Sequence, residues 1–111
     1  MYVTRFDKAK PYSAPEHNGM HMLRLQGKEA SPATSMWSAA LQLLPGGSTS
    51  LKASHQEKIY VVLEGEVTLC SDREEHVLRP WDSCLFERDE PRRLENRSNR
   101  PAIVLLVMGE Q

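Results

Sequence analysis

The feature that most constrains the fold is a series of short segments in which apolar and polar residues alternate, each bounded by turn residues. In residues 35–47, SMWSAALQLLPGG, alternate positions are apolar, and Pro45-Gly46-Gly47 is expected to end the strand. Alternation with a period of two is typical of strands that bury one face. No long window has the helical apolar period. The chain is therefore predicted to be all-β.

Further strands are predicted along the whole chain, separated by short turns. They are residues 2–6, 21–25, 59–63, 66–70, 76–80, 83–87, 92–96 and 102–108. Residues 10–19, which carry Pro, Ser and Gly, are expected to form a loop. Many short strands at this spacing are typical of a sandwich or barrel. At 111 residues, the chain has room for one domain, with an N-terminal arm and edge strands in 1–34 and a barrel in 35–111.

Charge and apolar runs exclude two classes of partner. The formal net charge of −1 gives no positive excess for nucleic acid or an anionic membrane. The longest apolar run, residues 102–108, is too short to cross a bilayer, and the first ten residues lack the apolar core of a signal peptide. Cys70 and Cys84 are expected to be half-buried strand thiols. A cytoplasmic protein is predicted, because two thiols without an export signal indicate a reducing compartment.

Two spaced motifs resemble those of the cupin superfamily, whose members are small double-sheet jelly-roll barrels. The first family motif runs Gly, five residues, His-x-His, three or four residues, Glu, six residues, Gly. From Gly46 that spacing reaches Gly65, and YVVLEGEV (60–67) is similar to the family's turn. The second motif ends at Asn96, and its spacing places Trp81 and Asp89 at the motif's two glycines. Asp82 matches an aspartate that commonly follows the first of them. The resemblance covers residues 36–108 and implies a cupin-like barrel.

The resemblance stops at the family's metal ligands, which are three histidines and a glutamate. Their positions hold Lys52, Ser54, Lys58 and Arg92 in this sequence. A divalent metal needs imidazole or carboxylate donors, and cationic side chains repel it. We therefore expect no metal and no other cofactor. A shifted register that uses His17, His21, His55 and His76 is the alternative that would restore a metal site.

The replacement residues predict a cationic pocket inside the barrel. Lys52, Ser54, Lys58 and Tyr60 are expected to face inward by parity, and Arg92 to enter from across the sheet. Such a pocket suits a small anion, either a carboxylate or an enolate, held by Arg92 as a fork. A lysine crowded by a second cation has a lowered pKa and can act as a base or nucleophile.

Three functions remain open at this point. The first is a metal-independent isomerase, cyclase or decarboxylase, with Lys58, Lys52 and Tyr60 as catalytic residues and Ser54, Arg92 and Lys52 binding the substrate. The second is a non-catalytic module that binds or senses a small anion, and the third is a structural partner of another enzyme. The same basic residues can also be a solvated, ion-paired cap on the barrel. The resemblance further implies a homodimer, formed through N-terminal strands.

Overall fold

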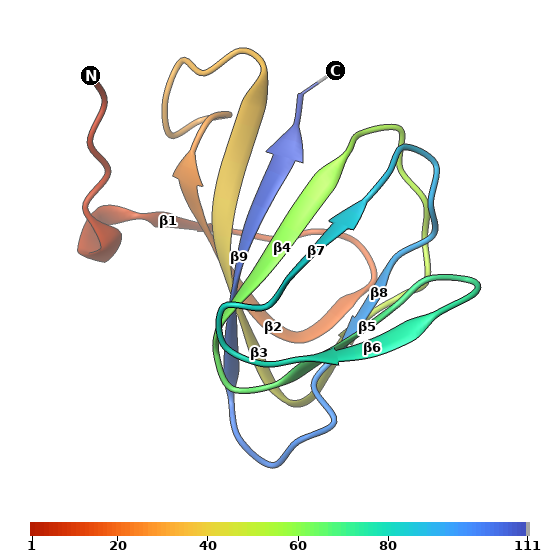
Figure 1. Ribbon diagram of the computed structural model, residues 1–111. Coiled ribbons are helices and arrows are strands. Elements are labelled where there is room, and N and C mark those ends of the chain that lie inside the picture. The colour runs from red at the N-terminus through yellow and green to blue at the C-terminus, as the bar shows by residue number, and fades with distance from the viewer. Residues whose placement is uncertain (111) are drawn as a thin grey trace.

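The computed structural model describes residues 1–110, and almost all of its regular structure is β-strand (Figure 1). One 3-10 turn, η1, spans Phe6–Lys8. The strands are β1 (Lys10–Tyr12), β2 (His17–Gln26), β3 (Met36–Thr49), β4 (Lys58–Glu64), β5 (Val67–Cys70), β6 (Glu75–Leu78), β7 (Ser83–Phe86), β8 (Arg93–Glu95) and β9 (Ala102–Gly109). The predicted all-β class is confirmed. Within residues 1–110, no helix is long and apolar enough to span a membrane.

The strands form one antiparallel sheet that curls into a jelly-roll barrel. The order is β6-β5-β8-β3-β9-β4-β7, and β2 and then β1 attach beside β3. The two ends of this order, β6 and β7, are joined by a short connection but have no ladder between them in the described chain. They form an open seam in an otherwise closed wall. Inward side chains such as Leu43, Val62 and Val104, all 0% exposed, fill the core.

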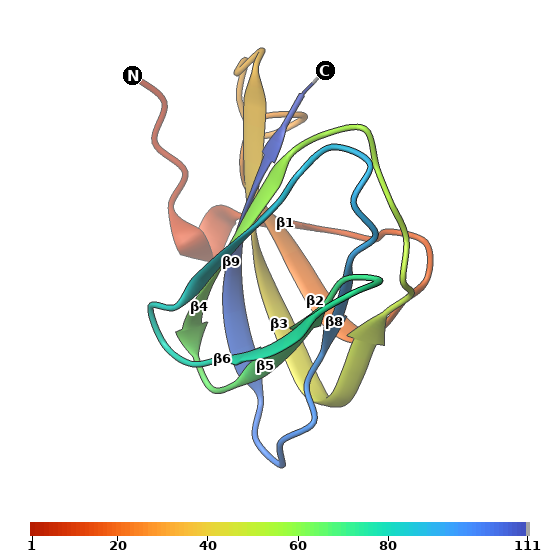
Figure 2. The same cartoon turned by 45° about the vertical axis from the view of Figure 1, so that its right-hand side comes forward.

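Strand β3 is longer than the sequence predicts. The turn residues Pro45-Gly46-Gly47 bend the strand instead of ending it, and the ladder to β2 shifts register at the same place. Gly46 has φ +83°, and a Cβ on Gly47 would lie 2.4 Å from the Gly19 oxygen. Beyond the bend, Ser48 pairs with Glu95 of β8 instead of with β9. Figure 2 shows the end of β3 turning away from β9 toward the side of the barrel that holds β8. Because glycines permit this bend, one strand contributes to both layers of the barrel.

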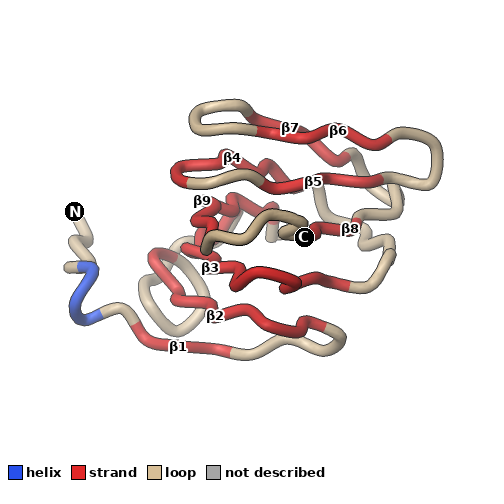
Figure 3. The backbone as a smooth tube through the Cα atoms, turned by 90° about the horizontal axis from the view of Figure 1, so that it is seen from below, coloured by secondary structure: helices blue, strands red, loops and turns tan. Residues whose placement is uncertain are grey.

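The N-terminal region differs most from the prediction. Residues 2–6 do not form a strand, and the first nine residues lie outside the barrel (Figure 3). Residues 10–19 are not wholly a loop, because β1 pairs with β2 and β2 begins at His17. The Arg24 guanidinium lies 3.8 Å from the Tyr12 ring centre and 4.6 Å from that of Trp37. This stacking holds β1 on the barrel through contacts that period-two alternation does not report.

The backbone supports the proposed motif frame. All four positions that correspond to family glycines have positive φ: Gly46 (83°), Gly65 (77°), Trp81 (73°) and Asp89 (64°). Glycine adopts this conformation freely, whereas a tryptophan there is strained. Asn96, at the second motif's last position, donates from its side chain to the Leu43 and Arg100 carbonyls. The two motifs therefore keep their turns although they have lost their ligands.

Trp81 provides a direct test of that strain. Because its side chain is 78% exposed, its replacement removes little packing from the core. We expect Trp81→Gly to be about 1 kcal/mol more stable than Trp81→Ala, since only glycine lacks the Cβ that opposes positive φ. Urea unfolding of the two variants measures the difference. Equal midpoints would show that the turn relaxes without cost.

Candidate functional site

A small cavity of about 200 Å³ lies inside the barrel beneath β1 and β2. Its wall is mainly apolar, from Leu41, Leu94 and Leu106 among others. Three of the predicted site residues, Lys58, Tyr60 and Arg92, line it together, and so do His17, Thr49, Tyr12 and the Trp37 ring. We call this space the cationic cavity. The volume lies below the roughly 300–1,000 Å³ of drug-sized sites, so it suits a small molecule.

Lys58 opens β4 and is only 1% exposed. Its Nζ donates to Ser54 Oγ at 2.7 Å. Burial lowers the Lys58 pKa, and the nearby Arg92 charge lowers it further, while Glu90 acts in the opposite direction. A neutral amine is both a base and a nucleophile. The cation that crowds Lys58 is therefore Arg92 rather than Lys52.

Arg92 enters the cavity just before β8. Its Nη1 donates to Thr49 Oγ1 at 2.7 Å, and the same oxygen accepts from the Leu94 amide at 3.1 Å. The Nε of Arg92 is buried and has no hydrogen-bond partner. Among the described residues, neither Arg92 nor Lys58 forms an ion pair, and no carboxylate lines the cavity. Arg92 as a whole is partly exposed, but a guanidinium whose Nε is buried without an acceptor or a counter-anion is costly, so the site is complementary to an added anion.

Tyr60 lies two residues beyond Lys58 on the same face of β4 and is 3% exposed. Its ring meets Phe86 edge-on, with centroids 5.9 Å apart. Burial raises the Tyr60 pKa to about 12, although Arg92 lowers it in part. The phenol is therefore protonated at neutral pH and can donate a hydrogen bond into the cavity.

Lys52 and Ser54 do not lie where parity along one strand places them. The Lys52 side chain is 63% exposed and pairs with Glu16 at 3.7 Å, so its expected inward position is wrong. The backbone of Lys52 forms only an isolated bridge with Arg92, and the regular strand β4 begins at Lys58. The alternation of inward and outward side chains along β4 therefore does not extend back to Lys52. Ser54 does not line the cavity, but its hydroxyl accepts a hydrogen bond from Lys58, which does.

His17 is the cavity residue that sequence reasoning missed in this role. The sequence predicts for it only an alternative role as a metal ligand. Its Nδ1 lies 2.7 Å from the Pro15 carbonyl oxygen, and its partner across the β2–β3 ladder is Thr49. Burial lowers the His17 pKa, and Arg92 and Lys52 add to that effect. No local spacing signals this placement, because it depends on pairing between distant parts of the chain.

The residues present do not fit the metal that most cupins hold. The four motif positions supply two ammonium groups, a hydroxyl and a guanidinium, none of which is a good ligand for a divalent cation. Within residues 1–110, no three His, Cys, Asp or Glu side chains are grouped closely enough to hold an ion. His55 and His76 instead pair separately with Asp89 and Glu74 at the surface.

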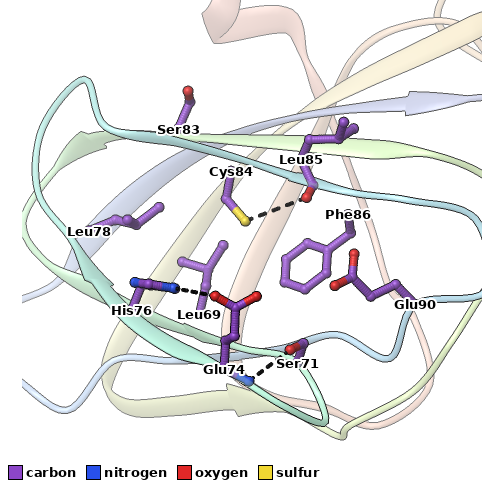
Figure 4. A pocket seen from close by; sticks show the side chains of 10 residues that line it. All are labelled: Leu69, Ser71, Glu74, His76, Leu78, Ser83, Cys84, Leu85, Phe86 and Glu90. Atoms are coloured by element: carbon purple, nitrogen blue, oxygen red, sulfur yellow. Dashed lines mark hydrogen bonds and ion pairs between the residues drawn. The ribbon is translucent and has the colours of Figure 1, made fainter.

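A second cavity of about 360 Å³ lies at the seam between β6 and β7, and we call it the seam cavity (Figure 4). Its floor is apolar, with Leu69, Leu78 and Phe86. The carboxylates of Glu74 and Glu90 turn toward the space in front of Phe86. Cys84, one of the lining residues, is a free thiol whose pKa is raised by burial. A protonated thiol is a weak nucleophile.

Comparisons with solved structures support the fold. A polyketide cyclase from Streptomyces resistomycificus superposes with a TM-score of 0.87 at 18% identity, covering 100% of this chain and 80% of that one. A predicted oxalate decarboxylase from Thermotoga maritima gives a TM-score of 0.82 at 25% identity, covering 98% and 99%. A structure of an RmlC-like cupin from Shewanella frigidimarina gives 0.83 at 13% identity, covering 100% and 92%.

The sequence itself has a full-length relative. A Mycobacterium tuberculosis protein named beta-D-galactosidase is 35% identical over 109 residues, which is 98% of this chain and 94% of that protein. The family model described as "Cupin domain" matches residues 40–108, which run from within β3 to β9 and include both motifs. The chain therefore belongs to the cupin family.

Proposed function

We propose that this chain is a metal-independent enzyme that acts on a small acidic, carbonyl-bearing molecule in the cationic cavity. The observation that carries the proposal is the Arg92 guanidinium, whose buried Nε has no partner in a cavity without a carboxylate. A bound carboxylate would supply the missing acceptor and neutralise the charge. The Thr49 hydroxyl, which holds Nη1 at 2.7 Å, fixes the orientation of the fork.

Lys58 and Tyr60 provide the chemistry in this proposal. The Lys58 amine, whose pKa is lowered by burial and by Arg92, takes a proton from carbon next to a carbonyl in its unprotonated form, or adds to the carbonyl as a nucleophile. Negative charge then develops on oxygen, where Arg92 and the Tyr60 hydroxyl stabilise it. Isomerisation and aldol-type cyclisation of a keto acid pass through an enolate formed by loss of that proton, and decarboxylation of a β-keto acid forms an enolate by loss of carbon dioxide. Lys52 has no place in this step because its side chain is exposed.

The relatives bear on substrate class without deciding it. The Thermotoga maritima protein, at 25% identity, is named for oxalate, a small dicarboxylate. That class of ligand agrees with the charge and the volume of the cationic cavity. The structures of lower identity support the fold alone.

Titration calorimetry with a matched set of ligands tests the proposal. Pyruvate, malonate and oxaloacetate are compared with the corresponding neutral amides, and NMR follows any conversion. We expect the acids to bind and the amides to fail, because only a carboxylate both accepts from the buried Nε of Arg92 and neutralises the guanidinium charge. Binding with no conversion would favour the alternative, a non-catalytic module that carries or senses a small anion. Failure of every acid to bind would contradict both.

Glycoside hydrolysis is a second candidate, suggested by the name of the Mycobacterium tuberculosis relative. That reaction uses two carboxyl groups across the bond that breaks, and the cationic cavity has none. Glu74 and Glu90 in the seam cavity are the pair that favours it. Hydrolysis of nitrophenyl β-D-galactoside that survives Arg92→Met but is lost in Glu74→Gln and Glu90→Gln would place activity there. Absence of hydrolysis would leave the cationic cavity as the candidate site.

A further inference from the structure

We propose that His17, rather than Lys58, is the base that takes the substrate's carbon-bound proton in the cationic cavity, on its Nε2, which leaves Lys58 the nucleophilic role of the two given above. This inference rests on the proposed function and adds a residue that neither cupin motif contains. It starts from the position of His17, which opens β2 and lines the cavity together with Lys58 and Arg92.

The backbone selects the tautomer of the ring. A carbonyl oxygen can only accept, so the 2.7 Å contact between His17 Nδ1 and Pro15 O requires the proton on Nδ1. The other nitrogen, Nε2, then carries a lone pair in the neutral ring. No hydrogen bond to Nε2 occurs among those of the described residues, so that lone pair is not committed to another group.

The surroundings keep the ring neutral. The described charged groups that act on His17 are Arg92, Lys52 and Glu16. Burial and the two cations outweigh the Pro15 hydrogen bond and the Glu16 carboxylate, and the His17 pKa falls below its usual value near 6.5. His17 is therefore unprotonated at neutral pH and ready to accept a proton.

The proposed step balances in atoms and charge. A substrate carboxylate binds Arg92, and the C–H bond beside the carbonyl breaks. Its proton forms an N–H bond on His17 Nε2, and its electron pair becomes the enolate, which Arg92 and Tyr60 stabilise. The imidazolium then returns the proton to carbon. Reversal in heavy water exchanges the substrate C–H for C–D without any further reagent.

Deuterium exchange into pyruvate provides the test, because it needs only proton transfer. Proton NMR in D₂O follows the methyl signal with wild-type protein, and calorimetry measures pyruvate binding. The matched variant is His17→Asn, whose amide can still donate to the Pro15 carbonyl but has no base. We expect exchange to fall by about 100-fold or more, with pyruvate affinity within a few-fold of wild type. The wild-type exchange rate should fall only below about pH 6.5, where His17 becomes protonated and can no longer act as a base.

The outcomes separate the two proposals. Equal exchange by wild type and His17→Asn, or no exchange by wild type that binds pyruvate, overturns the role of His17 alone. Absence of pyruvate binding overturns the anion site and this inference with it. Long-range ¹H–¹⁵N NMR of the wild type adds a test independent of activity, since a proton on Nε2 rather than Nδ1 contradicts the assigned tautomer.

Discussion

Replacement of Lys58 by methionine is expected to abolish turnover and to raise the free energy of unfolding at the same time. Lys58 is 1% exposed, and its amine has one hydrogen bond, to Ser54, and no ion pair among the described residues. Methionine fills a similar volume without a polar group to desolvate. Replacement of a buried ion pair by well-packed apolar residues is often neutral or stabilising by about 1–4 kcal/mol, and an amine without an ion-pair partner has less to offset its burial.

The lowered Lys58 pKa also predicts how the stability of the wild type changes with pH. The pKa of Lys58 is lower in the folded than in the unfolded protein, so between these two values the unfolded state binds more protons. Stability of the wild type should therefore rise with pH from the folded pKa up to about 10.5, and the penalty is fully present below the folded pKa. Lys58→Met should lack this slope.

Urea unfolding across pH 7–10.5, with Lys52→Met as the control, measures the effect. The Lys52 side chain is 63% exposed, so its replacement should change stability by no more than about 0.5 kcal/mol. A strong destabilisation by Lys58→Met would show that the amine is a needed structural donor. Full turnover in that variant would remove Lys58 from the mechanism.

Replacement of Arg92 by methionine should remove anion binding. Loss of one partner from a buried charge pair costs about 2–5 kcal/mol, which corresponds to a fall in affinity of roughly 30-fold or more. The fold should survive, because Thr49 Oγ1 still accepts from the Leu94 amide and donates to the Ser50 carbonyl. Calorimetry with the tightest acid from the ligand set measures the change.

The neighbouring residue is a matched control for Arg92. Arg93 has the same chemistry, but its side chain is 45% exposed and pairs with Glu95 outside the cavity. Arg93→Met should leave affinity within about 2-fold of wild type, because an exposed ion pair contributes little. Equal losses in the two variants would indicate a general effect of net charge. No loss in either would place the anion elsewhere.

The strand pattern was predictable where contacts are local. Residues 59–63, 83–87 and 102–108 were expected as strands and correspond to β4, β7 and β9. The pattern in residues 35–47 predicts a strand but not where that strand ends. Pro45-Gly46-Gly47 bends β3, which pairs with β9 before the bend and with β8 after it. A turn signal reports local flexibility, and only the neighbouring strands decide whether the ladder resumes beyond it.

The site was predictable only in part for the same reason. Lys58 and Tyr60 share one face of β4, so parity placed them correctly relative to each other. Lys52 lies in a loop, where no such rule holds, and its side chain points to solvent. His17 reaches the cavity through the pairing of β2 with β3. Neither placement has a local signature in the sequence.

The sequence alone determined the all-β class, the positions of the motif turns and the lack of metal donors at the four ligand positions. Each depends on residue identity or on a period within one short segment. The tertiary structure decided which basic groups are buried, which is exposed and which histidine joins them. Those outcomes depend on contacts between strands far apart in the chain, whose combined packing sets solvent exposure and so lowers the pKa values of Lys58 and His17.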